Sequence, residues 1–163
     1  MDRGLHVFLL TALAAVAALP GSPYTGPASA SPFLVPHPNG RFMYVVEKNA
    51  PRTWIYEIDP SDGRLTPTAG SPLATVPIPP IAAPLIDPSG RFLVYLQGFQ
   101  LTSYAVAPAT GALTSAGTLV FSMGSGAHAF SQDSQFLFVQ GANFQLRVLR
   151  LNPLTLLTDA STI

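Results

Sequence analysis

The chain has 163 residues, 48% of them hydrophobic and only 10% charged, with 17 prolines, 13 glycines and no cysteine. This composition is typical of a folded, turn-rich protein, and it excludes disulfides, thiolate zinc sites and cysteine nucleophiles. Lysine plus arginine and aspartate plus glutamate number 8 each, so no net field attracts nucleic acid and we expect no nucleic-acid partner.

The N-terminal segment is apolar from Val7 to Leu19 except for Thr11. This run is too short to cross a bilayer comfortably, so no membrane span is expected. It has the character of a secretory signal, with Ala28-Ser29-Ala30 as a candidate cleavage site, which predicts a periplasmic or extracellular protein. If residues 1–19 are not a signal, we expect a cytoplasmic protein.

A turn pattern recurs along the rest of the chain. Pro38-Asn39-Gly40-Arg41-Phe42 returns as Pro88-Ser89-Gly90-Arg91-Phe92, an offset of 50 residues (91 − 41). A third copy without the glycine, Ser134-Gln135-Phe136, follows 44 residues later (136 − 92). Proline with its preset φ, an Asn or Ser side chain and a glycine that tolerates positive φ favour a tight turn, so we expect a strand on each side.

The strands predicted after these turns differ in their apolar pattern. Phe42 to Val46 and Phe92 to Leu96 are continuous apolar runs, expected where neighbouring sheets cover both faces of a strand. From Trp54 to Asp59 the residues alternate, with Glu57 on the polar face, as expected nearer the rim. Behind each such strand comes a proline, at Pro60, Pro108 and Pro153, with spacings of 48 (108 − 60) and 45 (153 − 108) residues.

A repeat of about 40 to 50 residues with four short strands is typical of a propeller blade. Helical repeats are excluded because proline and glycine every few residues would interrupt any helix. We therefore predict an all-β fold, a partial β-propeller of about three four-stranded antiparallel blades over residues 20–163, preceded by the apolar N-terminal segment. The blades are expected at about 21–65, 66–113 and 114–160. Because closed propellers have about four to eight blades, closure requires self-association or blades from outside this chain.

Two motifs resemble those of a known family. They are Asp87-Pro88-Ser89-Gly90-Arg91-Phe92, and Asp59-Pro60-Ser61-Asp62-Gly63-Arg64-Leu65 followed by Gly70-Ser71-Pro72, which itself matches Gly21-Ser22-Pro23. Over roughly residues 20 to 160 they resemble the bacterial lactonase family of seven-bladed β-propellers, which includes the propeller type of 6-phosphogluconolactonase. The resemblance implies a hydrolase of a sugar lactone such as 6-phosphogluconolactone, with no cofactor. Because such motifs also occur in propellers that are not enzymes, the alternatives are a non-catalytic binding module or a truncated fragment.

The antiparallel strand order predicts which loops share an end of the sheets. The Pro-x-Gly turns lie at one end, where His37, Arg41, Asp87 and Arg91 are expected to serve the turns and the surface. The loops after the second and fourth strands of each blade lie at the opposite end. That opposite end is where a ligand site is expected.

His128 stands at the predicted start of an innermost strand, after Gly124-Ser125-Gly126. Its imidazole is the candidate catalytic group, a general base that activates water against a lactone carbonyl. It resembles the histidine that often follows a Gly-Pro pair in blades of the family, with Ala127 in place of the proline. The alternative is a histidine that is hydrogen-bonded to a neighbouring blade.

Glu47, Lys48 and Arg52, in the loop after Val46, are the candidate substrate-binding residues. A carboxylate beside two cations offers a base together with groups that hold an acidic substrate or a developing oxyanion. The alternative is an ordinary solvated loop. Nothing in the sequence indicates a metal site.

Overall fold

The computed structural model describes residues 32–48, 50–75, 83–97, 100–120, 127–140 and 146–152. Residues 1–19, predicted as a signal, lie outside these ranges, as do the Gly21-Ser22-Pro23 element and Gly124-Ser125-Gly126.

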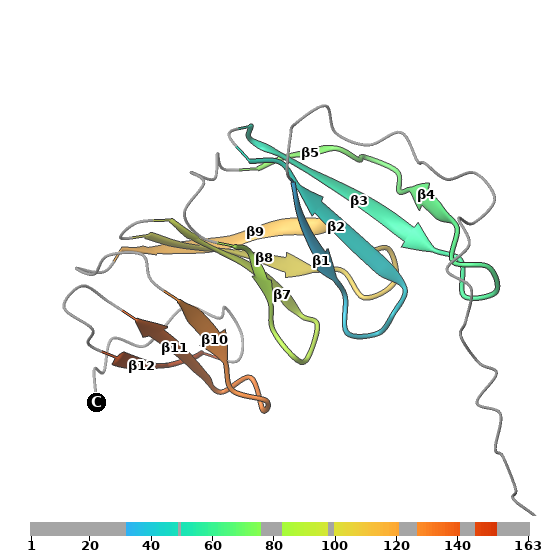
Figure 1. Ribbon diagram of the computed structural model, residues 1–163. Coiled ribbons are helices and arrows are strands. Elements are labelled where there is room, and N and C mark those ends of the chain that lie inside the picture. The colour runs from blue at the N-terminus through green and yellow to red at the C-terminus, as the bar shows by residue number, and fades with distance from the viewer. Residues whose placement is uncertain are drawn as a thin grey trace, which may run out of the picture.

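Three antiparallel sheets make up the described part of the chain, which contains no helix (Figure 1). The first sheet consists of β1 (Phe33–Pro36), β2 (Phe42–Val46), β3 (Arg52–Ile58), β4 (Leu65–Pro67) and β5 (Leu73–Ala74). The second consists of β6 (Leu85–Ile86), β7 (Phe92–Gln97), β8 (Gln100–Val106) and β9 (Leu113–Val120). The third consists of β10 (His128–Phe130), β11 (Phe136–Gln140) and β12 (Leu146–Arg150). The predicted all-β fold and partial propeller are confirmed, with the second sheet lying between the other two.

The first two sheets end later in the chain than the predicted blade boundaries. Leu65 of β4 pairs with Ile58 of β3, and β5 also pairs with β3, so the first sheet continues to residue 74. The second sheet continues to residue 120, because β9 pairs along the whole of β8. The boundaries at 65/66 and 113/114 therefore cut through paired strands. The physical reason is that the turns after β3 and β8 fold the chain straight back onto the preceding strand, where its backbone groups find partners.

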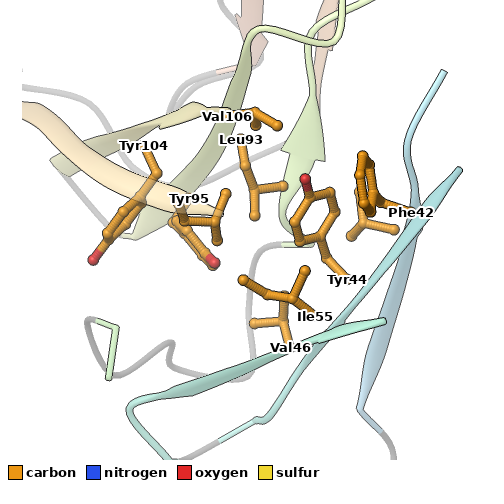
Figure 2. Close-up of a cluster of buried hydrophobic side chains, with 10 residues drawn as sticks. Phe42, Tyr44, Val46, Ile55, Leu93, Tyr95, Tyr104 and Val106 are labelled. Carbon is orange, nitrogen blue, oxygen red and sulfur yellow. The ribbon is translucent and has the colours of Figure 1, made fainter. Parts of the chain in front are cut away.

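Apolar side chains fill the space between the first and second sheets (Figure 2). Tyr44 and Val46 of β2 are fully buried and point towards Leu93 and Tyr95 of β7, which are fully buried as well. The Tyr44 hydroxyl donates a hydrogen bond across this interface to the Gly111 carbonyl over 3.0 Å. Burial raises the pKa of Tyr44 above its ordinary value, so the phenol stays neutral in the core.

A second apolar layer lies between the second and third sheets. Val94 and Leu96, on the face of β7 opposite Leu93, pack with Leu137 and Val139 of β11. Every residue of the run that begins at Phe92 and ends at Leu96 is buried, with an exposure of 5% or less. The predicted cover on both faces of this strand is therefore confirmed.

A hydrogen bond links the Pro-x-Gly turns of the first and second sheets. His37 Nε2 lies 2.8 Å from the Gly90 carbonyl oxygen, and because a carbonyl only accepts, this nitrogen donates. A Cβ atom on Gly90 would lie 2.5 Å from His37 Cε1, so glycine is required for this close approach. Asp87 accepts the backbone N–H of Phe92 over 2.7 Å. The predicted turn role is confirmed, but His37 and Asp87 are buried rather than on the surface.

Replacement of Leu93 by alanine tests the first interface. Because Leu93 is fully buried between two sheets, we expect Leu93→Ala to lower the free energy of unfolding by about 2–5 kcal/mol, measured by urea denaturation. Val120→Ala is the control, since Val120 is 74% exposed and its truncation should change stability by less than about 0.5 kcal/mol. Equal losses for the two variants would contradict face-to-face packing as the source of stability.

Candidate functional site

One end of the sheets gathers the candidate site residues. Val46 pairs with Thr53 at this end of the first sheet, and His128 pairs with Val139 at this end of the third. The Pro-x-Gly turns lie at the opposite end of the strands. We call the end with the candidate residues the loop end, and its described residues include 47–48, 50–52, 83, 100, 127–128 and 140.

Glu47 follows β2 directly and is buried, with an exposure of 1%. Its Oε2 accepts a hydrogen bond from Arg52 Nη2 over 3.0 Å, and its Oε1 accepts one from Trp54 Nε1 over 2.7 Å. The backbone N–H of Glu47 donates to the Arg52 carbonyl over 3.1 Å. A buried carboxylate needs such partners. The alternative that this segment is an ordinary solvated loop therefore does not hold for Glu47.

The two cations of the cluster remain nearer the solvent. The Arg52 side chain is 50% exposed although Glu47 holds its guanidinium. Lys48 Nζ lies 4.5 Å from the centre of the Phe33 ring, in a cation–π arrangement. Arg52 is held by Glu47 whereas Lys48 lies over Phe33, and both oxygens of the carboxylate already accept hydrogen bonds. The arrangement therefore suits the holding of an anion better than general base chemistry by Glu47.

His128 is the first residue of β10 and faces the second sheet. Its Nε2 lies 2.9 Å from the carbonyl oxygen of Ala83, which precedes β6. A carbonyl only accepts, so Nε2 carries the proton, and in the neutral ring Nδ1 carries the lone pair. The contact is the hydrogen bond to a neighbouring blade that the sequence offered as the alternative to catalysis. His128 thus contacts the second sheet, whereas Glu47 and Arg52 form a pair on the first and Lys48 lies over Phe33.

A hollow of about 360 Å³ lies beside His128. Ala129, Phe138 and Leu146 form most of its apolar lining, and Gln140 contributes a polar side chain. Phe138 alternates along β11 with Leu137 and Val139, which pack on the second sheet, so the hollow opens on the opposite face of the third sheet. This apolar lining suits the packing of another sheet rather than a sugar.

A buried polar cluster lies near the loop end and was not predicted from the sequence. Thr53 Oγ1 lies 2.9 Å from the Tyr95 hydroxyl and 3.1 Å from Thr75 Oγ1, which ties the first sheet to the second. Burial raises the pKa of Tyr95, although the hydrogen bond with Thr53 opposes the shift, so the phenol stays neutral. The repeat offered one signal for this cluster. Thr53 occupies the position at which the second unit has Leu101 (53 + 48), so a polar side chain stands there in place of an apolar one.

Across the described ranges, no three His, Asp or Glu side chains lie together in a way that could hold a metal ion. The same residues include no helix of the length and apolarity needed to cross a membrane.

No protein-family model and no curated protein matches the sequence. Solved structures, however, share its fold. A protein provisionally assigned as a 6-phosphogluconolactonase from Bacteroides uniformis has a TM-score of 0.65 at 20% identity, and another from Bacteroides fragilis has 0.64 at 17%. The periplasmic gluconolactonase PpgL of Pseudomonas aeruginosa has 0.64 at 26% identity.

These similarities cover most of this chain but less than half of each neighbour. In the same order they cover 85%, 85% and 84% of this chain, and 42%, 39% and 40% of the three neighbours. The chain therefore spans about two fifths of the length of these proteins. The resemblance to lactonase-like propellers is confirmed at the level of the fold.

The Glu47 cluster can be tested through the single tryptophan of the chain. Glu47→Ala removes the acceptor of both Arg52 and Trp54, so we expect a loss of about 1–3 kcal/mol in the free energy of unfolding and a shift in tryptophan emission. Glu57→Ala is the matched control, because its ion pair with Arg41 is about half exposed and should contribute less than about 1 kcal/mol. Unchanged emission in Glu47→Ala would contradict the tryptophan hydrogen bond.

Proposed function

We propose that this chain is a lactonase-like β-propeller protein that takes a small sugar lactone, or the corresponding sugar acid, at its loop end. The observation that carries the proposal is the half-exposed Arg52 guanidinium, held in place by a carboxylate that is itself buried. The similarity in fold to a gluconolactonase and to provisionally assigned 6-phosphogluconolactonases supports the choice of ligand class.

Arg52 is suited to oxygen-rich anions. A guanidinium has five N–H donors in a planar fork, and the hydrogen bond from Nη2 to Glu47 uses one of them. Because Glu47 is fixed by Trp54 as well, the guanidinium is oriented before a ligand arrives, which lowers the entropic cost of binding. Carboxylate, phosphate and hydroxyl oxygens of a sugar acid or lactone are complementary to this guanidinium.

Hydrolysis of a bound lactone would proceed by attack of water on its carbonyl carbon. In the proposed step, Nδ1 of His128 takes a proton from that water, since Nε2 is occupied by the Ala83 carbonyl. The carbonyl oxygen becomes an oxyanion in a tetrahedral intermediate. The bond between that carbon and the ring oxygen then breaks, the ring oxygen recovers the proton from His128, and the product is the open hydroxy acid.

A non-catalytic binding module is the second candidate, and one observation favours it. The groups that could act as bases at the loop end already serve the fold, since His128 joins two sheets and both oxygens of Glu47 accept hydrogen bonds. In that case the loop end binds the same sugar acid without turnover.

We also propose export to the periplasm, with residues 1–19 as the signal. The periplasmic location of the gluconolactonase neighbour supports this. Expression of the full chain in a Gram-negative host should then give a shortened chain in the periplasmic fraction, identified by its intact mass. A full-length chain that stays in the cytoplasm would contradict the proposal.

Arg52→Gln tests the binding site, because glutamine keeps a donor for Glu47 but loses the charge. We expect the wild-type chain to bind gluconate in an NMR titration, and Arg52→Gln to raise the dissociation constant about tenfold or more, which is about 1.4 kcal/mol. Arg64→Gln is the matched control, since Arg64 is exposed in the turn after β3, away from the loop end, and pairs with Asp62. Equal affinities for both variants would contradict a role for Arg52.

Turnover separates the two candidate functions. The wild-type chain and His128→Gln are offered glucono-lactone and 6-phosphogluconolactone, and acid release is followed at constant pH. Turnover that His128→Gln loses, with the fold intact by circular dichroism, supports the hydrolase. Turnover that survives the substitution removes His128 from the mechanism, and gluconate binding without any turnover favours the binding module.

A further inference from the structure

A buried polar contact joins the first and second sheets directly beside Arg52. The Tyr95 hydroxyl of β7 lies 2.9 Å from Thr53 Oγ1 of β3, and Thr53 Oγ1 lies 3.1 Å from Thr75 Oγ1. Tyr95 and Thr53 are fully buried, and Thr75 is buried as well. Because Thr53 follows Arg52 in the chain, this contact lies one residue from the backbone that carries the guanidinium.

Hydrogen bonds hold the backbone around Arg52 on both sides. On one side the Glu47 N–H donates to the Arg52 carbonyl over 3.1 Å. On the other side, where β5 pairs with β3, the Thr75 N–H donates to the Pro51 carbonyl over 2.8 Å. Thr75 thus contacts this segment twice, through its N–H at Pro51 and through its hydroxyl at Thr53. The two threonine hydroxyls therefore act together with the strand pairing to fix the Arg52 backbone.

The next interface along the chain has aliphatic side chains at the same repeat positions. Leu101 stands 48 residues after Thr53 (101 − 53), and Val139 stands 44 residues after Tyr95 (139 − 95). Both are buried in the apolar layer between the second and third sheets. Two sheets can therefore pack at this place without hydroxyl groups. The hydroxyl pair occurs in the interface beside the arginine, which indicates a role besides packing.

We propose that Tyr95 is a positioning residue for Arg52, because its hydroxyl, acting through Thr53, fixes the backbone from which the guanidinium extends. The inference rests on the proposed function, in which Arg52 holds the sugar acid. Glu47 orients the far end of the Arg52 side chain, and the contact between Tyr95 and Thr53 orients its near end. Tyr95 is fully buried, so it acts through Thr53 and does not touch the ligand. The site on the first sheet thereby depends on a side chain of the second.

Two tyrosine variants form a matched pair for the test. Tyr95→Phe removes the hydroxyl and keeps the ring, which packs edge-on against Tyr104 with 5.3 Å between the ring centres. Tyr44→Phe is the control, because the Tyr44 hydroxyl also joins the first and second sheets, but its acceptor is the Gly111 carbonyl in the turn after β8. Both tyrosines are fully buried, and their hydroxyl groups point in opposite directions (Figure 2). Each variant therefore loses one buried hydrogen bond between the same two sheets, and only Tyr95→Phe loses it beside Arg52.

Gluconate affinity is measured for both variants by NMR titration. We expect Tyr95→Phe to raise the dissociation constant about fivefold or more over that of the wild-type chain, which is about 1 kcal/mol, and Tyr44→Phe to change it by less than about twofold. The melting temperatures of the two variants should fall by similar amounts, which separates the effect on binding from a general loss of stability. An equal loss of affinity in both variants, or no loss in Tyr95→Phe, would overturn the proposal.

A double variant tests whether Tyr95 acts through Thr53. Thr53→Val removes the other hydroxyl of the contact, so it should weaken gluconate binding at least as much as Tyr95→Phe does. Because both substitutions break the same contact, the double variant should bind no more than about twofold more weakly than Thr53→Val alone. Two losses that simply multiply would exclude the route through Thr53.

Hydrogen exchange of two backbone amides tests the positioning without any ligand. The amides of Glu47 and Thr75 donate to the carbonyls of Arg52 and Pro51, so their exchange rates report how firmly this segment is held. We expect Tyr95→Phe to increase both rates about fivefold or more, and Tyr44→Phe to increase them less.

The exchange rates also separate this inference from the proposed function. Faster exchange in Tyr95→Phe, together with no gluconate binding by the wild-type chain, would refute the ligand and uphold the positioning of Arg52. Exchange rates in Tyr95→Phe equal to those of the wild type would refute the positioning, whatever the wild-type chain binds.

Discussion

The structure depends on the burial of both faces of a single strand, β7. Leu93 and Tyr95 face the first sheet while Val94 and Leu96 face the third, so one strand contributes to two apolar layers. Full burial of each such side chain stabilises a protein by roughly 1.5–3 kcal/mol. Since side chains alternate with a period of two, a slip of one residue in the pairing of β7 would exchange the two sets. Correct register in the second sheet is therefore a condition for both interfaces.

Polar contacts fix how the sheets align, at both ends of the strands. At the turn end His37 donates to the Gly90 carbonyl, and at the loop end His128 donates to that of Ala83. Each such hydrogen bond contributes only about 0.5–1.5 kcal/mol net, less than one well-buried aliphatic side chain. The apolar layers therefore hold the sheets together, while each histidine adds one directional contact between neighbouring sheets.

The repeat made most of the fold predictable, whereas the burial of particular polar side chains was not. The 50-residue offset and the apolar run from Phe92 to Leu96 predicted paired strands covered on both faces, as observed. What the sequence could not predict is which polar side chains come to lie inside. The sequence pattern of the turn that follows His37 is the same whether the turn is exposed to solvent or packed against a neighbouring sheet. Glu47 is buried because β3 folds back along β2 and brings Arg52 and Trp54 onto its carboxylate, a contact that depends on tertiary pairing.

The placement of the three sheets also bears on the chemistry of the loop end. Its candidate groups lie on an arc, with Arg52 on the first sheet and His128 on the third, and the second sheet between them. On an open arc, water reaches the guanidinium and screens its attraction for an anion, whereas a closed ring would exclude much of that water and strengthen the interaction. The fold and the strength of the loop-end site are therefore linked, because the stacking of the sheets determines how much water reaches the guanidinium.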